Sequence, residues 1–244
     1  MCIIAIKKKS VGYPSYQRVK NMCENNNDGF AIVWKAKDEP VRNYRTLNEQ
    51  KFLKKYKEIT STYKASDVSL FIHARIKTHG TQKLENCHGW IEDKVGLAFA
   101  HNGILSIKNR DDMTDSETFF RDIFVPVFEI GGWDAGERAI KACIGTSKFC
   151  FMDVFGNILH YGAYITGDDG VLYSNDSYNE YSWRRYQCGS YTNYNYDKYY
   201  HGNYKPNNNQ VAKKETKVIG KGIDDYDDWY NSEEFWNQRS VTPF

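Results

Sequence analysis

The second residue of the chain, Cys2, stands directly before an apolar run, residues 3–6, that is typical of a buried strand. If Met1 is removed, Cys2 carries its thiol and a free α-amine on the same carbon. An α-amine titrates near ~7.7–8.0, so much of it is a neutral base at cellular pH, and a thiol beside such a base is an activated nucleophile. The simpler alternative is that Cys2 is a small apolar residue at the start of a strand.

Composition limits the class of protein. The chain has 244 residues, enough for one well-buried domain with an appendage, and its formal charge of +2 gives no indication of a nucleic-acid partner. No apolar stretch approaches the ~20 residues that span a bilayer, and the first strand is too short for a signal-peptide core. No two cysteines have the Cys-x-x-Cys spacing, so we expect no metal site, no disulfide framework and a cytoplasmic location. Without a P-loop or a Gly-rich dinucleotide motif, no cofactor is expected.

The order of the predicted elements favours an α+β domain over a doubly wound parallel sheet, because strands come first, helices lie in the middle and strands return. We expect lysines 7–9 to be exposed and the loop at residues 75–89 to be too polar for the core. The predicted strands span residues 3–6, 30–34, 68–74, 96–100, 148–154, 158–165 and 171–173. The predicted helices open at Pro14 and span residues 48–59, 116–129 and 134–144, the last two separated by Gly131-Gly132.

The composition changes near residue 184. Residues 188–210 are dominated by Tyr, Asn, Gly and Ser, and such a stretch buries too little apolar surface to offset its chain entropy. Residues 223–236 interleave acidic residues with five aromatic ones, which is typical of a short docking motif or of a disordered tail. We favour docking, because unpartnered aromatic residues promote aggregation. Residues 185–244 are therefore expected to be a flexible or partner-binding tail.

Several polar segments lie at predicted strand ends and loops, where functional residues usually gather. Each segment alone has a structural explanation. Arg75 fits a surface ion pair, Asn102-Gly103 is a strong hairpin-turn signal, and residues 114–117 fit the start of a helix. The polar segments are Cys2, residues 72–80, 86–88, 101–103 and 114–117.

Together and in this order, these segments resemble class II glutamine amidotransferases, whose glutaminase domain belongs to the N-terminal nucleophile (Ntn) hydrolase superfamily. The resemblance spans roughly residues 2–180, and a set of motifs in order is more specific than any single motif. The matching segments are Met-Cys at 1–2, Asp-Gly-Phe at 28–30, His-x-Arg-x-x-Thr-His-Gly at 73–80, Asn-x-His at 86–88, His-Asn-Gly at 101–103, Thr-Asp-Ser-Glu at 114–117 and Ser-Asn-x-Ser-Tyr at 174–178.

The resemblance implies a fold and a nucleophile. The fold is a four-layer αββα sandwich of two antiparallel sheets flanked by helices, and it would occupy residues 2–184 as a type 2 glutamine amidotransferase (glutaminase) domain. Cys2 would attack the side-chain amide of glutamine and form a thioester that water hydrolyses. The α-amine of Cys2 would move the proton, and the Asn102 side chain with the Gly103 backbone N–H would bind the oxyanion.

The resemblance also implies how glutamine is recognised. Arg75 offers a planar fork to the α-carboxylate, and the Asp115 carboxylate would pair with the α-ammonium. Thr78, His79 and Gly80 would shape the same pocket. For the three histidines of the other motifs a structural role is the more common one; they are His73, His88 and His101.

Two departures from the family pattern lie outside the chemistry: Ile76 replaces the tryptophan of sugar-amidating members, and Gly89 replaces a common proline. We expect the segment after residue 184 not to be the family's synthase domain, because it is too short and too polar. We therefore expect a glutaminase that supplies ammonia to a separate synthase. One alternative is hydrolysis of another γ-glutamyl amide or peptide by the same cysteine. Another is a non-catalytic binding or assembly protein on an amidotransferase fold.

Overall fold

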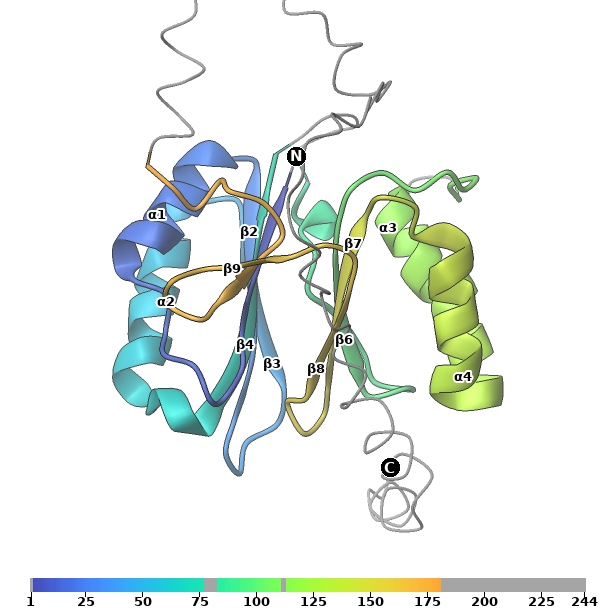
Figure 1. Cartoon of the computed structure of the whole chain (residues 1–244), viewed down its shortest axis with the longest axis horizontal. Coiled ribbons are helices and arrows are strands. Elements are labelled where there is room, and N and C mark those ends of the chain that lie inside the picture. The colour runs from blue at the N-terminus through green and yellow to red at the C-terminus, as the bar shows by residue number, and fades with distance from the viewer. Residues whose placement is uncertain (1, 77–82, 111–112, 181–244) are drawn as a thin grey trace, which may run out of the picture. The chain divides into compact units, whose positions relative to one another are not determined.

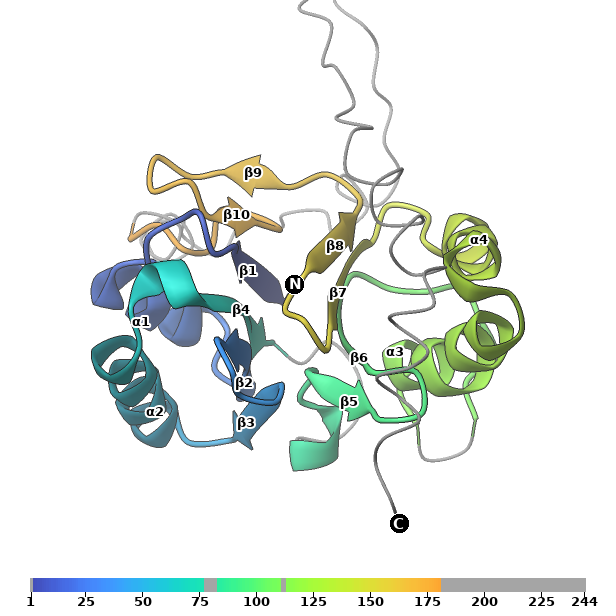
Figure 2. The same cartoon turned by 90° about the horizontal axis from the view of Figure 1, so that it is seen from below.

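The apolar run after Cys2 forms the strand β1 (Ile3–Lys7), which lies inside the first of two sheets. The computed structural model describes residues 2–76, 83–110 and 113–180. Neighbouring strands of this sheet are all antiparallel. Figure 2 shows β3 at one edge of the sheet and β9 at the other. In sheet order the six strands are β3 (Arg42–Thr46), β2 (Gly29–Ala36), β4 (Val68–Arg75), β1, β10 (Leu172–Tyr173) and β9 (Ile165–Thr166).

The second sheet has four strands, which are also antiparallel to their neighbours. Its strand β6 ends in the residues of the predicted His-Asn-Gly turn, and Asn102 is paired with Lys148 of β7. His101 and Asn102 therefore belong to the strand, and the turn begins only at Gly103. In sheet order the strands are β5 (Trp90–Glu92), β6 (Leu97–Asn102), β7 (Lys148–Asp153) and β8 (Ile158–Tyr161).

Helices cover the outer face of each sheet, so the domain has four layers (Figure 1). α1 and α2 pack on the first sheet, and their N-cap residues Ser15 and Asn48 each accept a backbone N–H at the third residue beyond the cap. The α+β class and the two antiparallel sheets flanked by helices confirm the predicted architecture. The helices are α1 (Tyr16–Asn25), α2 (Glu49–Thr62), α3 (Asp115–Thr118), the π-helical η3 (Phe119–Phe124) and α4 (Val125–Cys143), with short 3-10 turns η1 (Ala65–Asp67) and η2 (Leu84–Asn86).

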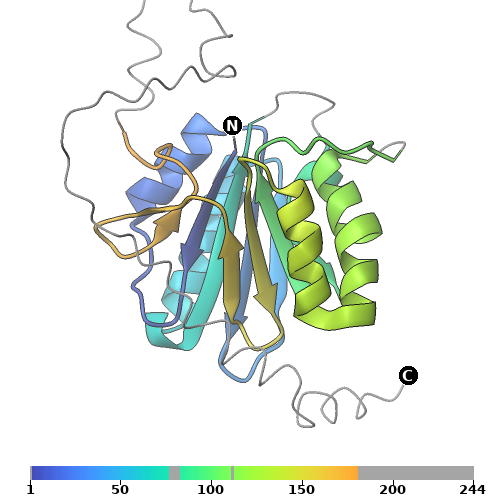
Figure 3. The same cartoon turned by 45° about the vertical axis from the view of Figure 1, so that its right-hand side comes forward.

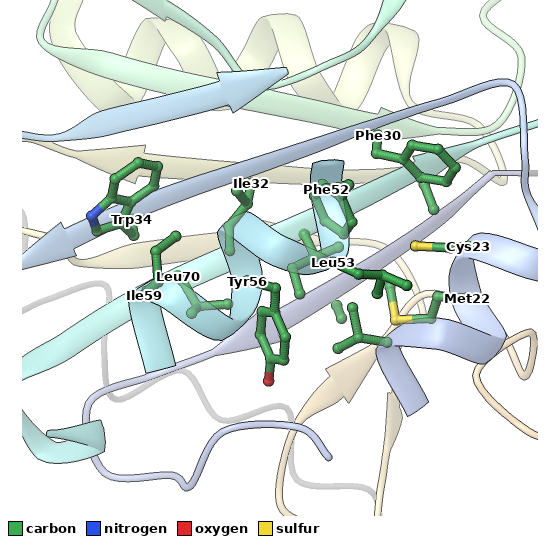
Figure 4. Close-up of a cluster of buried hydrophobic side chains, with 14 of the residues drawn as sticks. Met22, Cys23, Phe30, Ile32, Trp34, Phe52, Leu53, Tyr56, Ile59 and Leu70 are labelled. Atoms are coloured by element: carbon green, nitrogen blue, oxygen red, sulfur yellow. The ribbon is translucent and has the colours of Figure 1, made fainter. Parts of the chain in front are cut away.

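Side chains of β1 alternate between two apolar cores, as the period of a strand requires. Ile3 and Ala5 face the core under α1 and α2, where Phe30 stacks on Phe52 with ring centroids 5.4 Å apart (Figure 4). Ile4 and Ile6 face the core between the two sheets. Because both faces of the strand are buried, the sequence is apolar at every position instead of alternating.

A cluster of aromatic rings joins the second sheet to its helices. Phe99 of β6 lies 4.9 Å from Phe120 and 4.8 Å from Phe151, measured between ring centroids. The backbone between α3 and α4 makes a π-helical turn, and α4 is interrupted at Gly131 and Gly132, whose φ and ψ are not helical. The predicted breaker is therefore confirmed, while the predicted helix at residues 116–129 consists of an α-helical, a π-helical and a second α-helical segment in succession.

The structure corrects several sequence predictions. Lys7 is fully buried, where Nζ donates to the carbonyl oxygens of Ala65 and Val68, the latter 2.6 Å away, and burial lowers its pKa to about 8. The loop at residues 75–89 enters the core, because Cys87 and His88 are buried. Strand β3 was not predicted, since its polar, half-exposed sequence is stabilised by pairing with β2 and not by an apolar pattern of its own.

All described residues fall in one unit of the chain, Met1–Cys188, and the predicted domain limits at residues 2–184 and 185–244 stay a prediction. The predicted tail lies outside the described residues. Across the described ranges, none of the helices is both long and apolar enough to cross a membrane.

Candidate active site

The predicted nucleophile lies at the end of the two sheets where β1 begins and β4 and β6 end (Figure 3). Ile3 is paired with Ala74, which places Cys2 beside Arg75 at the end of the ladder. The half-buried Cys2 thiol lies 3.7 Å from the Ile76 carbonyl oxygen, to which it donates. Burial raises the pKa of the Cys2 thiol more than the nearby Arg75 charge lowers it, so a separate base is needed to form the thiolate.

The Ser-Asn segment that follows β10 holds the strand of the nucleophile in place. The Asn175 side chain donates to the Cys2 carbonyl oxygen over 2.7 Å, and the Ser174 N–H donates to the Ile4 carbonyl oxygen over 2.9 Å. Ile4 in turn donates its N–H to Ser174 Oγ over 2.8 Å. The sequence motif carried no predicted role for Ser174 or Asn175, because their partners Ile4 and Cys2 lie 170 and 173 positions away.

Asn102 and Gly103 occupy the end of β6 beside this segment. Asn102 is 1% exposed, its Nδ2 donates to Ser174 Oγ over 2.8 Å, and its Oδ1 has no partner among the described residues. Gly103 has φ +147°, and a Cβ at this position would lie 2.9 Å from Ser147 Cα. Only glycine fits this conformation and this close approach.

Arg75 is a buried cation at the same end of the sheet. It is 7% exposed, and its Nη1 has no partner among the described residues. Its backbone is fixed, because its carbonyl oxygen accepts the Asp28 N–H over 2.9 Å at the Asp-Gly turn that begins β2. A buried guanidinium with an open donor is a strong binding group for a carboxylate.

Asp115 is held by three hydrogen bonds at the start of α3. Leu105 N–H donates to Oδ2 over 2.7 Å, and Oδ1 accepts the Ser116 N–H over 2.7 Å and the Ser116 hydroxyl over 3.1 Å. An ionised carboxylate accepts about four hydrogen bonds, so one acceptor direction remains for a cation. Thr114 caps the helix by accepting the Glu117 N–H, which confirms that residues 114–117 also serve as a helix start.

The three motif histidines form a buried stack between the sheets. The ring centroids of His73 and His88 lie 4.0 Å apart, and those of His88 and His101 lie 6.1 Å apart. Burial lowers the pKa of His73 to about 3, that of His101 to about 4 and that of His88 well below its ordinary value. His88 Nδ1 accepts the His101 backbone N–H over 3.1 Å, and His101 Nδ1 lies 2.7 Å from Ser116 Oγ. The neutral histidine rings therefore connect β4 to β6 and extend to Ser116, the residue next to Asp115.

Unpartnered polar atoms concentrate at this site. Buried polar groups in proteins are nearly always hydrogen-bonded, so such a concentration is typical of a place that receives a polar ligand. Among the described residues, the buried atoms of the site without a partner are both ring nitrogens of His73, Arg75 Nη1, His101 Nε2 and Asn102 Oδ1.

Five of the eight predicted site residues lie in the described part of the chain: Cys2, Arg75, Asn102, Gly103 and Asp115. Thr78, His79 and Gly80 lie outside the described residues. Over those described ranges, no group of three or more His, Cys, Asp or Glu side chains is arranged to hold a metal ion. A surface cavity of about 450 Å³, lined by residues of β2, β3 and α2, includes none of the predicted site residues.

Comparisons with known proteins agree with the motifs. No protein-family model matches the chain. A Haemophilus influenzae protein named "Putative glutamine amidotransferase" is 30% identical over 105 residues, which are 42% of this chain and 34% of that protein. The matched part therefore spans about a third of the length of this relative.

Two solved structures are similar over 71% of this chain. One is the glutamine phosphoribosylpyrophosphate amidotransferase from B. subtilis, at 15% identity, a TM-score of 0.42 and 41% coverage of that chain. The other is a class II glutamine aminotransferase domain protein from Silicibacter pomeroyi, at 18% identity, a TM-score of 0.40 and 87% coverage. The predicted resemblance to glutamine amidotransferases agrees with the name of the Haemophilus influenzae relative.

Proposed function

We propose that the chain hydrolyses the side-chain amide of L-glutamine to glutamate and ammonia, with Cys2 as the nucleophile after Met1 is removed. The observation that carries this proposal is the position of Cys2. It lies beside Arg75, a buried cation with an open donor, and its strand is tied through Ser174 to Asn102. A nucleophile, a carboxylate-binding group and an oxyanion donor are the parts that attack on an amino-acid amide requires.

The reaction proceeds in two steps. The α-amine of Cys2, directly or through a water molecule, accepts the thiol proton while Sγ attacks the amide carbon. The resulting oxyanion is bound by the Asn102 amide and the Gly103 N–H. The C–N bond then breaks, the amine passes its proton to the departing ammonia, and a thioester remains. Water attacks the thioester with the same amine as base, which releases glutamate and restores the thiol.

Recognition of the free amino acid rests on two charged groups. Arg75 binds the α-carboxylate, and the free acceptor direction of Asp115 binds the α-ammonium. The sequence motif assigns Thr78, His79 and Gly80 to the same pocket, and these three residues lie outside the described part of the chain. A substrate whose α-amino group is blocked, such as N-acetylglutamine, loses one of these two contacts and is expected to be hydrolysed more slowly.

As a second part of the proposal, residues 2–184 form the glutaminase domain, and the acidic–aromatic end of the segment at residues 185–244 docks a separate synthase that receives the ammonia. Affinity capture with the full chain and with a chain that ends at residue 184 tests this part. We expect the synthase to be recovered only with the full chain. Equal recovery by the shorter chain would assign docking to the domain itself.

The activity is tested by measuring glutamate and ammonia released from L-glutamine by the full chain. Cys2→Ala is expected to abolish release, and Asn102→Ala to reduce kcat by ~10²–10³, the usual effect of losing one oxyanion donor. Cys143→Ala changes another half-buried free cysteine and is expected to keep the wild-type rate. Wild-type rates for Cys2→Ala would disprove the proposal.

Mass spectrometry of the N-terminus provides an independent check. We expect the active protein to begin at Cys2, and an added residue before Cys2 to abolish activity because the free amine is then lost. If the purified protein retains Met1 and still turns over glutamine, the α-amine is not the base. If it neither loses Met1 nor turns over any γ-glutamyl compound, the chain is a binding protein.

A further inference from the structure

The hydroxyl of Ser174 connects the strand of the nucleophile to the predicted oxyanion donor. Ser174 Oγ accepts the Ile4 N–H over 2.8 Å and one N–H of the Asn102 side chain over 2.8 Å. Ile4 belongs to β1 of the first sheet, and Asn102 belongs to β6 of the second. One buried side chain, 3% exposed, thus sets the position of β6 relative to the strand that begins after Cys2.

The position of Ser174 is itself fixed by the backbone. The Ser174 N–H donates to the Ile4 carbonyl oxygen over 2.9 Å, and the Ile4 N–H donates to the Ser174 hydroxyl. Two hydrogen bonds therefore connect these two residues. Asn175 adds a third tie through its bond to the Cys2 carbonyl oxygen. The hydroxyl therefore presents its second acceptor direction to Asn102 from a rigid support.

The amide of Asn102 depends on this contact for its orientation. Its Nδ2 has two N–H groups, of which one is committed to Ser174, and its Oδ1 has no partner in the described part of the chain. With one N–H held, the rotation of the amide is fixed and the other N–H points in a single direction. A donor fixed before the reaction stabilises a developing oxyanion without a cost of reorganisation.

We propose that Ser174 is a positioning residue, whose hydroxyl orients the Asn102 amide toward the oxyanion that forms on attack by Cys2. This inference rests on the proposed function. Ser174 does not contact the substrate. Its effect is exerted through Asn102, and it is therefore larger on kcat than on KM, because the oxyanion exists only after attack.

Kinetics of three variants test this role. Ser174→Ala is expected to lower kcat on the order of 10²-fold, the scale of a misplaced catalytic group, with KM changed less than about threefold. Ser174→Thr keeps the hydroxyl and is expected to retain more activity than Ser174→Ala. Ser69→Ala is the matched control: Ser69 is also 3% exposed and lies in the first sheet, but in β4 near the opposite end of the strand from Arg75. It is expected to keep the wild-type kcat.

A double-mutant cycle separates positioning from general loss of structure. If Ser174 acts through Asn102, the variant with both Ser174→Ala and Asn102→Ala is no slower than Asn102→Ala alone, because the group to be oriented is already absent. Multiplied losses in the double variant, or an unchanged kcat in Ser174→Ala, would overturn the inference.

A spectroscopic readout is independent of turnover. The two side-chain amide protons of Asn102 are expected to shift in ¹H–¹⁵N spectra of Ser174→Ala and to stay unchanged in Ser69→Ala, with folding of each checked by its Tm. An unshifted Asn102 amide in Ser174→Ala contradicts the inference. If the amide shifts but the wild-type chain releases no glutamate from glutamine, the contact is real and the proposed function is the part that fails.

Discussion

The imidazole rings of His73 and His88 stack face to face in the interior, with centroids 4.0 Å apart and an angle of 16° between their planes. Neither ring is exposed by more than 6%, and burial holds the pKa of both below the ordinary value. The pair spans from β4 toward β6, so the two sheets meet at the site through uncharged histidines. Protonation of either ring would place a charge against its neighbour and near Arg75.

The histidine stack predicts a loss of stability in acid. The unfolded histidines titrate near 6.5, whereas the folded pKa is about 3 for His73 and about 4 for His101. Because the folded pKa is lowered, the unfolded state binds more protons below pH 6.5, and stability falls as the pH drops toward 4. Between pH 7 and pH 5 the loss is roughly 2 kcal/mol per buried histidine. Urea unfolding at pH 7 and pH 5 measures this loss of unfolding free energy. His73→Leu is expected to reduce the loss by the contribution of one histidine. An equal loss in His73→Leu would contradict this account.

Gly103→Ala is expected to abolish activity and to destabilise the fold. Its φ of +147° suits glycine, and an added Cβ would overlap Ser147, so the backbone N–H must move away from its present position. Gly12→Ala is the control, since no atom lies within 4 Å of the Cβ that it would add. Glutaminase rates and Tm values of both variants check this. Wild-type activity in Gly103→Ala would show that the backbone N–H of residue 103 does not bind the oxyanion.

Arg75→Met is expected to separate stability from substrate binding. Without glutamine bound, Nη1 of Arg75 has no partner among the described residues, so its removal leaves no partner of Nη1 unpaired. We therefore expect the Tm of the substrate-free variant to stay the same or to rise. Hydrogen bonds to charged groups contribute about 1.5–3 kcal/mol, so the KM for glutamine should rise roughly 10- to 150-fold. Arg42→Met, at an exposed position paired with Glu39, should leave KM unchanged. A lowered Tm with an unchanged KM would show that Arg75 is structural.

Ser116→Ala tests the link between the stack and Asp115. The hydroxyl lies 2.7 Å from His101 Nδ1 and donates to Asp115 Oδ1 over 3.1 Å, so its removal leaves a buried ring nitrogen unpaired at a cost of about 1–3 kcal/mol. Asp115 keeps its two backbone donors, and we expect KM to rise while kcat stays close to wild type. Ser66→Ala is matched to it, because Ser66 also donates to a neighbouring aspartate over 3.1 Å but at an exposed position. Equal unfolding energies for the two variants would rule out the buried link.

Local sequence patterns predicted much of the secondary structure. Short runs of apolar residues mark the central strands β1 and β2, because strands buried on both faces are largely apolar. The residue Asn48 and the pair Gly131-Gly132 mark a helix start and a helix interruption through backbone preferences that act over a few residues. The order of the polar motifs indicated the site, since the residues involved stand at the ends of these strands.

What only the tertiary structure decided depends on contacts between distant parts of the chain. Strand β3 exists because β2 offers it a partner, and Lys7 is buried because carbonyl oxygens of residues 65 and 68 receive its ammonium group. The tie between Ile4 and Ser174 joins positions 170 apart, and the tie between Asn102 and Ser174 joins positions 72 apart. Composition and periodicity describe neighbours along the chain, so they indicated the strands, whereas the candidate residues came from the resemblance of the ordered motifs to a known family. The Ser174 hydroxyl contacts both Ile4 and Asn102 only because the two sheets pack against each other. No local sequence pattern predicts that packing.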